Sequence, residues 1–205
     1  ADAGGALMNG QDVVADGRMY VKMSALYHRD GRPPTPTMFQ CEDGNPVRIH
    51  KILGVCNAAD RKIAGEGFRY ACVVGGKRVT LVYDDKAWRW YVEQAPPSAG
   101  GVAEPRAREW TVFEHEGKAY VDVLAVCPAR GGAPQPKKLW WEDGREYIID
   151  SVSDVRRATS LRAGGVGLRY ACQINGREKH LYFENAIQRW FVERKNSRCV
   201  ADTTP

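Results

Sequence analysis

The chain has 205 residues, of which 43% are hydrophobic and 27% charged, the balance of a folded protein rather than a disordered one. This length fits one ordinary domain or two small ones and excludes a large multidomain enzyme. The net charge of +5 permits a polyanionic partner without requiring one. No segment has the roughly 20 uninterrupted apolar residues of a membrane-spanning helix, so we expect no membrane anchor, and no signal peptide is visible.

The sequence repeats itself at a constant offset of 100 residues. Residues 13–94 align with residues 113–194 without a gap, with 25 identities in 82 positions. Residues 69–72 recur at 169–172, and residues 89–93 recur at 189–193 with one change. We therefore interpret the chain as two tandem copies of one domain, at 13–94 and 110–194. An Ala-, Pro- and Gly-rich linker is expected at 95–109, and a loose tail at 195–205.

Within each copy the side-chain pattern predicts short antiparallel strands, because apolar, β-branched and aromatic residues alternate with polar ones. In the first copy the strands are expected at 12–15, 19–27, 38–42, 46–55, 67–74, 77–83 and 88–93. Residues 74–77 and 174–177 carry Gly-Gly and Asn-Gly pairs, which are typical of tight type I′ hairpin turns. Helical periodicity is nearly absent, with one short turn conceivable at 58–63.

The predicted fold is therefore all-β, with two tandem copies of a small antiparallel barrel or strongly bent sheet, SH3-like or related. A two-sheet sandwich is the next choice. Each alternative places neighbouring strands antiparallel, and the pattern alone does not decide between them.

No catalytic or cofactor signature is present. The six cysteines form no CxxC pair and have no histidine at ligand spacing, so we expect no metal site and favour free thiols over disulfides. The four histidines face other residue types in the opposite copy, and no hydrolase, metalloprotease or kinase motif occurs. The glycine-rich loops at 65–70 and 164–170 lead into strands rather than helices, which indicates bends and not phosphate cradles. We predict a protein that is not an enzyme, without catalytic residues or a cofactor.

The candidate binding residues are aromatic and basic. Trp140 and Trp141 stand where the first copy has Gln40 and Cys41, and neighbouring strand residues point to opposite faces, so one tryptophan should lie outside. An exposed indole beside cations suits base stacking, peptide binding or packing against the sister copy. Arg69 and Arg169 are retained in both copies, most simply as members of ion pairs. The complete candidate set is Arg69, Arg169, Trp140, Trp141, Lys137 and Lys138.

Residues 141–147, 165–172, 176–184 and 189–193 together resemble small all-β bacterial proteins of unknown function, some of which are encoded beside DNA-repair polymerases. The resemblance covers the second copy, and the first departs from it at Cys41 and Pro46. It implies a bacterial cytoplasmic module with a nucleic acid or a DNA-repair-associated protein as its partner.

These observations predict a non-enzymatic binding module that recognises a nucleic acid or an accessory protein surface. The alternative is an interaction protein with a protein or peptide partner only. Because the two copies are fused, we also expect them to pack against each other, with Trp140 or Trp141 at or beside their interface.

Overall fold

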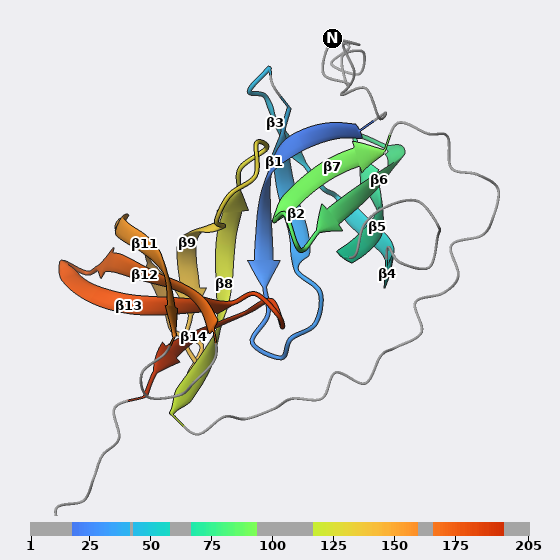
Figure 1. The fold of residues 1–205 in the computed structure, drawn as a ribbon. Coiled ribbons are helices and arrows are strands. Elements are labelled where there is room, and N and C mark those ends of the chain that lie inside the picture. The colour runs from blue at the N-terminus through green and yellow to red at the C-terminus, as the bar shows by residue number, and fades with distance from the viewer. Residues whose placement is uncertain (1–17, 42, 58–66, 94–116, 160–165, 195–205) are drawn as a thin grey trace, which may run out of the picture.

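The computed structural model describes residues 18–41, 43–57, 67–93, 117–159 and 166–194, and every regular element within them is a β-strand (Figure 1). The all-β prediction is confirmed. The strands of the first half, residues 18–93, are β1 Arg18–Tyr27, β2 Thr35–Gln40, β3 Pro46–Arg48, β4 Lys51–Asn57, β5 Gly67–Val74, β6 Lys77–Asp84 and β7 Arg89–Glu93. Those of the second half, residues 117–194, are β8 Lys118–Cys127, β9 Gln135–Trp140, β10 Glu146–Ile148, β11 Ser151–Thr159, β12 Val166–Ile174, β13 Arg177–Glu184 and β14 Arg189–Glu193.

Five of the seven strand pairs have bounds that coincide at the offset of 100, and the other two differ by one or two residues at one end. The expected strands from 19 to 93 match the observed ones to within one residue at each end, with two exceptions: the strand expected at 38–42 lies at 35–40, and 46–55 is divided between β3 and β4, which ends at 57. The expected strand at 12–15, the possible turn at 58–63, the linker at 95–109 and the tail at 195–205 lie outside the described residues.

The hairpin turns follow from local sequence. Gly75 and Gly76 have φ angles of 53° and 78°, and Asn175 and Gly176 have 51° and 69°, as a type I′ turn requires at both central positions. In β1, Met19, Val21, Met23, Ala25 and Tyr27 are buried while the residues between them are exposed or half-buried, which is the alternation of a sheet with one face on the core.

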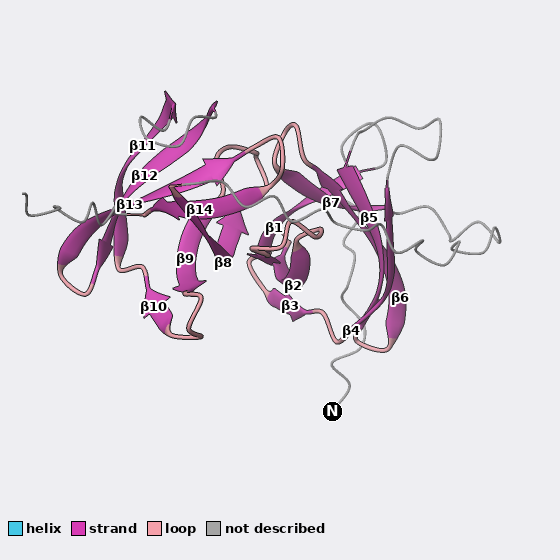
Figure 2. Ribbon diagram, turned by 90° about the horizontal axis from the view of Figure 1, so that it is seen from below, coloured by secondary structure: helices cyan, strands magenta, loops and turns pink. Residues whose placement is uncertain are grey.

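The strands form one antiparallel sheet of 14 strands, ordered β11-β12-β13-β14-β8-β1-β7-β6-β5-β4, with β2–β3 and β9–β10 attached to β1 and β8. This path is not closed, because β11 and β4 lie at its two ends. Figures 1 and 2 show the sheet strongly bent rather than flat.

Between β3 and β4 the chain changes partners within two residues. Ile49 N donates to Thr37 O at 3.1 Å, and His50 N donates to Val73 O at 3.0 Å. Ile149 N and Asp150 N make the corresponding bonds to Lys137 O and Gln173 O in the second half. In the first half the chain therefore pairs first with β2 and then with β5, and in the second half first with β9 and then with β12. Each half thus curls back on itself.

The two halves meet through β1 and β8. Residues 23–27 of β1 pair with residues 127–123 of β8, and the register is symmetric about the Ala25–Ala125 pair. Residues 18–21 of β1 pair with β7, while residues 22–26 pair with β2 on the edge opposite β8. One strand thus joins its own half to the other, and most buried apolar side chains of both halves form one cluster, beside two small ones.

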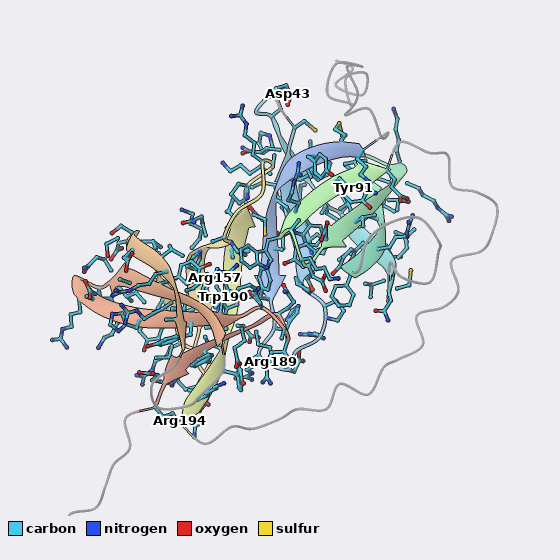
Figure 3. All side chains as sticks on the ribbon, in the orientation of Figure 1. Asp43, Tyr91, Arg157, Arg189, Trp190 and Arg194 are labelled. Atoms are coloured by element: carbon cyan, nitrogen blue, oxygen red, sulfur yellow. The ribbon has the colours of Figure 1, made fainter. Side chains whose placement is uncertain are left out.

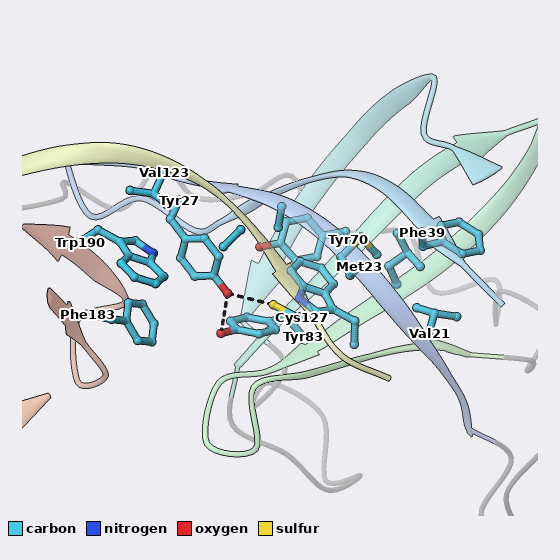
Figure 4. Packing of buried hydrophobic residues seen from close by; sticks show 14 of the residues in the cluster. Val21, Met23, Tyr27, Phe39, Tyr70, Tyr83, Val123, Cys127, Phe183 and Trp190 are labelled. Carbon is cyan, nitrogen blue, oxygen red and sulfur yellow. Dashed lines mark hydrogen bonds between the residues drawn. The ribbon is translucent and has the colours of Figure 1, made fainter. Parts of the chain in front are cut away.

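Tyr27 lies at the centre of this junction (Figure 4). Its ring centroid lies 5.6 Å from that of Phe183 and 6.1 Å from that of Trp190 in the second half. Its hydroxyl lies 3.1 Å from Tyr83 Oη and 3.3 Å from Cys127 Sγ. Because Cys127 occupies the position equivalent to Tyr27, a large side chain in one half meets a small one in the other.

Further contacts across the junction come in matched pairs. Arg89 Nε donates to Ala129 O at 3.3 Å, and Arg189 Nη2 donates to Arg29 O. Each guanidinium also lies 3.4 Å from the ring centroid of a tyrosine of its own half, Tyr20 or Tyr120. Figure 3 labels Arg189 and Trp190 at this position. Each arginine therefore connects its own half to a backbone carbonyl of the other half.

The aromatic contacts across the junction come from Tyr27 and Trp88, which meet Phe183 and Trp190. Neither Trp140 nor Trp141, expected at or beside the interface, takes part in these contacts, and their place at the interface stays a prediction. Trp140 lies at the end of β9, beside Lys138 of its own strand, and Trp141 packs against the core cluster. Sequence pattern could not distinguish these positions because the β1–β8 pairing that defines the junction is not local.

Candidate nucleic-acid interface

The six residues singled out from the sequence do not form one site. Arg69 lies on β5 and Arg169 on β12, near opposite ends of the sheet, while Trp140 and both lysines belong to β9. Three of their four basic side chains, those of Arg69, Arg169 and Lys138, have polar partners. Arg69 forms an ion pair with Glu93, and Arg169 and Glu193 both hydrogen-bond to Tyr182. The ion pair expected of the retained arginines is present at Arg69, and for Arg169 it stays a prediction.

The β9 candidates divide between different environments. Lys138 Nζ donates to both carboxylate oxygens of Glu146 at 3.1 and 3.2 Å and lies 5.6 Å from the Trp140 ring centroid. Lys137 is exposed at the point where the β8–β9 register shifts. Trp140 and Trp141 are both half-buried, so neither is the fully exposed indole that base stacking would favour.

A different set of basic residues gathers at the end of the β5–β6 hairpin. Lys51 on β4 and Arg78 on β6 are both direct cross-strand partners of Val73 on β5. Directly paired residues project from the same face of a sheet, so both side chains flank Val73 on one surface. Lys77 begins β6 beside Arg78 and, as the next residue along the strand, projects from the opposite face of the sheet at the same corner. We call His50, Lys51, Lys77 and Arg78 the basic tip.

Two hydrogen bonds of His50 connect the segments that carry the basic tip. His50 N donates to Val73 O at 3.0 Å, and Gly75 N donates to His50 Nδ1 at 3.4 Å, so the β3–β4 bend is tied to the hairpin turn. A register shift between Ile52 and Gly54 sets Lys51, rather than its neighbour, opposite Val73. Three segments of the chain are thereby held at one corner.

The cations of the basic tip are exposed, and Lys51, Lys77 and Arg78 make no ion pair in the part of the chain that the structure describes. By contrast, Arg29, Lys118, Lys138, Arg145, Arg156 and Arg194 each lie within 4.0 Å of a carboxylate. Three unneutralised positive charges at one corner raise the local potential more than the modest net charge of the chain suggests.

The equivalent corner of the second half has the opposite character. Asp150, Ser151, Arg177 and Glu178 stand in place of His50, Lys51, Lys77 and Arg78, with the same backbone bond to Gln173 and the same cross-strand register. One positive and two negative charges replace three positive ones. His180 Nε2 also lies 3.6 Å from Glu178. The scaffold itself therefore does not require the cations of the first half.

The buried thiols are held in their neutral form. Burial raises the pKa of the Cys72 thiol to about 12 and those of Cys127 and Cys172 to about 11, which suppresses the reactive thiolate. Cys72, Cys127 and Cys172 are free thiols. Among the described residues, no group of three or more His, Cys, Asp or Glu is arranged to hold a metal ion. The same part of the chain contains no helix able to span a membrane.

Sequence reasoning missed the basic tip. Lys51 and Arg78 are 27 positions apart and neither belongs to a charge run. The available signal lies in the difference between the two copies, in which Lys51 faces Ser151 and Arg78 faces Glu178. A search among the residues that both copies share cannot find a site whose residues differ between the copies.

Comparison of the chain with protein-family models, with curated proteins and with solved structures gives no match. The resemblance to small bacterial all-β proteins therefore stays a prediction, and a function can be inferred only from the geometry of the chain itself.

Proposed function

We propose that the protein is a non-enzymatic module that binds nucleic acid through the basic tip. The observation that carries this proposal is the cluster of Lys51, Lys77 and Arg78, exposed and without ion pairs among the described residues, at a corner that is acidic in the other half. A phosphate backbone recruits such a cluster because neutralising the phosphates releases condensed counterions. A cytoplasmic location, which the free thiols favour, belongs to the same proposal.

The fold that presents the tip is, in this proposal, a duplicated one. The coincident strand bounds and the symmetric β1–β8 register support two copies of a single domain. The backbone bonds at Ile49, His50, Ile149 and Asp150 support an SH3-like, barrel-like curl of each copy. Duplication would allow one corner to acquire cations while its counterpart lost them.

Fluorescence anisotropy of labelled DNA and RNA with the full-length chain at low salt tests the proposal. Lys51→Ser combined with Arg78→Glu introduces the residues of the second half at the same register, so the fold is expected to persist. This double variant should abolish most of the binding. Arg157→Asn, which introduces the first-half residue at an exposed β11 position labelled in Figure 3, should bind as the wild type does. Unchanged binding by the double variant would refute the proposal.

A protein partner is the second candidate, and one observation favours it. Ile148 on β10 is 60% exposed and pairs directly with Lys138 on β9, so both side chains project from the same face of the sheet. An exposed apolar side chain of this size is a candidate contact for a protein partner. Ile148→Arg introduces the residue found at Arg48 of the first half. Pull-down of a protein by the wild type but not by this variant, with no nucleic-acid binding by either, would favour this second function.

A further inference from the structure

The surroundings of the basic tip restrict which nucleic acid it would bind. None of the Phe, Tyr or Trp side chains in the described first half is exposed. The least buried include Tyr20, which lies under the Arg89 guanidinium, and Phe68, near the opposite end of β5 from the tip. Six residues of extended strand separate Phe68 from Val74, about 20 Å. Among the described residues of the first half, the tip therefore has no aromatic platform on which an unpaired base could stack.

Base reading also lacks a structural basis at this corner. Discrimination between bases in a groove depends on side chains held in bidentate orientation. Arg78 makes no hydrogen bond or ion pair within the described residues that would fix its guanidinium, and Lys51 is equally unrestrained. Both side chains can contact phosphate oxygens, which tolerate many orientations, but nothing aligns them with one base edge.

The spacing of the cations suits a duplex. Lys51 and Arg78 are separated by two strand intervals, about 10 Å between Cα atoms. This separation lies between the widths of the minor and major grooves, about 6 and 12 Å, so the two long side chains can contact phosphates on both strands bordering one groove. A site that recognises charge alone also prefers the polymer with the higher charge density, which is the duplex.

We infer that the basic tip binds double-stranded nucleic acid through its phosphates, without reading the bases. This inference rests on the proposed function and adds the class of ligand and the absence of sequence specificity. Two phosphate contacts, from Lys51 and Arg78, give a slope of log K against log salt of about −1.8 for a duplex and about −1.4 for a single strand. Between 50 and 200 mM salt the duplex affinity should fall about 12-fold.

The experiment compares labelled 20-base-pair duplexes of mixed, A·T-rich and G·C-rich sequence with unstructured 20-nucleotide single strands. Anisotropy titrations with the full-length chain are made from 25 to 200 mM NaCl. We expect the three duplexes to bind within about fivefold of each other, since one base-reading contact would produce at least that difference. Every duplex should bind more tightly than the single strands, and the Lys51→Ser/Arg78→Glu variant should lose this binding while Arg157→Asn retains it.

Two results would overturn the inference and leave the proposed function intact. They are tighter binding of single strands than of duplexes, and a more than tenfold preference among the duplexes, each abolished by Lys51→Ser/Arg78→Glu. A variant that binds every ligand as the wild type does would instead remove the proposed function, because binding would not depend on the basic tip.

Discussion

The hydrogen bond between Tyr83 and Gln188 tests whether the two halves unfold as one unit. Tyr83 Oη donates to Gln188 Oε1 at 2.7 Å, both side chains are buried, and they lie 105 positions apart. Tyr83→Phe introduces the residue found at Phe183 and leaves the Gln188 carbonyl oxygen without this donor. An unsatisfied buried acceptor costs about 1–3 kcal/mol, so the free energy of unfolding should fall by that amount.

A double-mutant cycle isolates the contribution of the contact. Gln188→Met keeps the length of the side chain but removes its polar atoms, including the Nε2 that donates to Asn185 O at 2.7 Å. Tyr83 retains its hydrogen bond with Tyr27 in this variant. Urea unfolding should show the double variant less destabilised than the sum of the single variants by about 1 kcal/mol, within the range found for residues in contact.

Tyr70→Phe provides the matched control. Tyr70 is also buried, but its hydroxyl donates at 2.7 Å to Pro34 O within the same half. It should be destabilising by itself and additive with Gln188→Met. A coupling below about 0.3 kcal/mol between Tyr83 and Gln188 would refute the packing of the halves through this bond.

Three further outcomes are expected. Burial, followed by the charge of Arg32, lowers the pKa of His28, so between this lowered pKa and about 6.5 the unfolded chain binds more protons than the folded chain. Urea unfolding should therefore show stability falling as the pH is lowered from 7 to 5, and falling less steeply in His28→Gln. Iodoacetamide at pH 8.5 should leave Cys72, Cys127 and Cys172 unmodified in the native protein and alkylate them in urea, as peptide mass spectrometry would show; equal labelling in both states would contradict their raised pKa values. Arg189→Lys should lower the free energy of unfolding by about 1–2 kcal/mol, because lysine cannot both cover the Tyr120 ring and donate to Arg29 O. Unchanged thermal stability would show that these two contacts of Arg189 do not stabilise the junction.

The strands and their hairpins could be predicted from the sequence because their causes are local. The Gly75–Gly76 and Asn175–Gly176 pairs determine turn geometry, and the alternation in β1 determines which face is buried. The offset of 100 then extended each assignment in one half to the other.

The junction could not be predicted, because its register depends on the pairing of Ala25 with Ala125, for which no local pattern exists. Tyr27 shows the difficulty. Its alternation indicates a core position, but only the structure shows that its ring contacts Phe183 and Trp190 of the other half.

The candidate site was missed for a related reason. Lys51 is brought opposite Val73 by a register shift at residue 53, and a single displaced position would have turned its side chain to the other face. Conversely, Lys138 beside Trp140 looked like a binding pair from sequence, whereas Glu146 on β10 neutralises the lysine. Cross-strand partners, rather than sequence neighbours, decide which charges remain available.

Transplanting the basic tip from one half to the other tests its role most directly. The recipient carries Lys51→Ser and Arg78→Glu in the first half, and Asp150→His, Ser151→Lys and Glu178→Arg in the second, all at matching positions. Duplex DNA affinity is measured against salt for the wild type, the first-half variant and the transplant. The wild type should show a slope near −1.8, the first-half variant should lose most binding, and the transplant should recover both affinity and slope. The same slope in all three proteins, or no recovery in a folded transplant, would contradict binding through this corner.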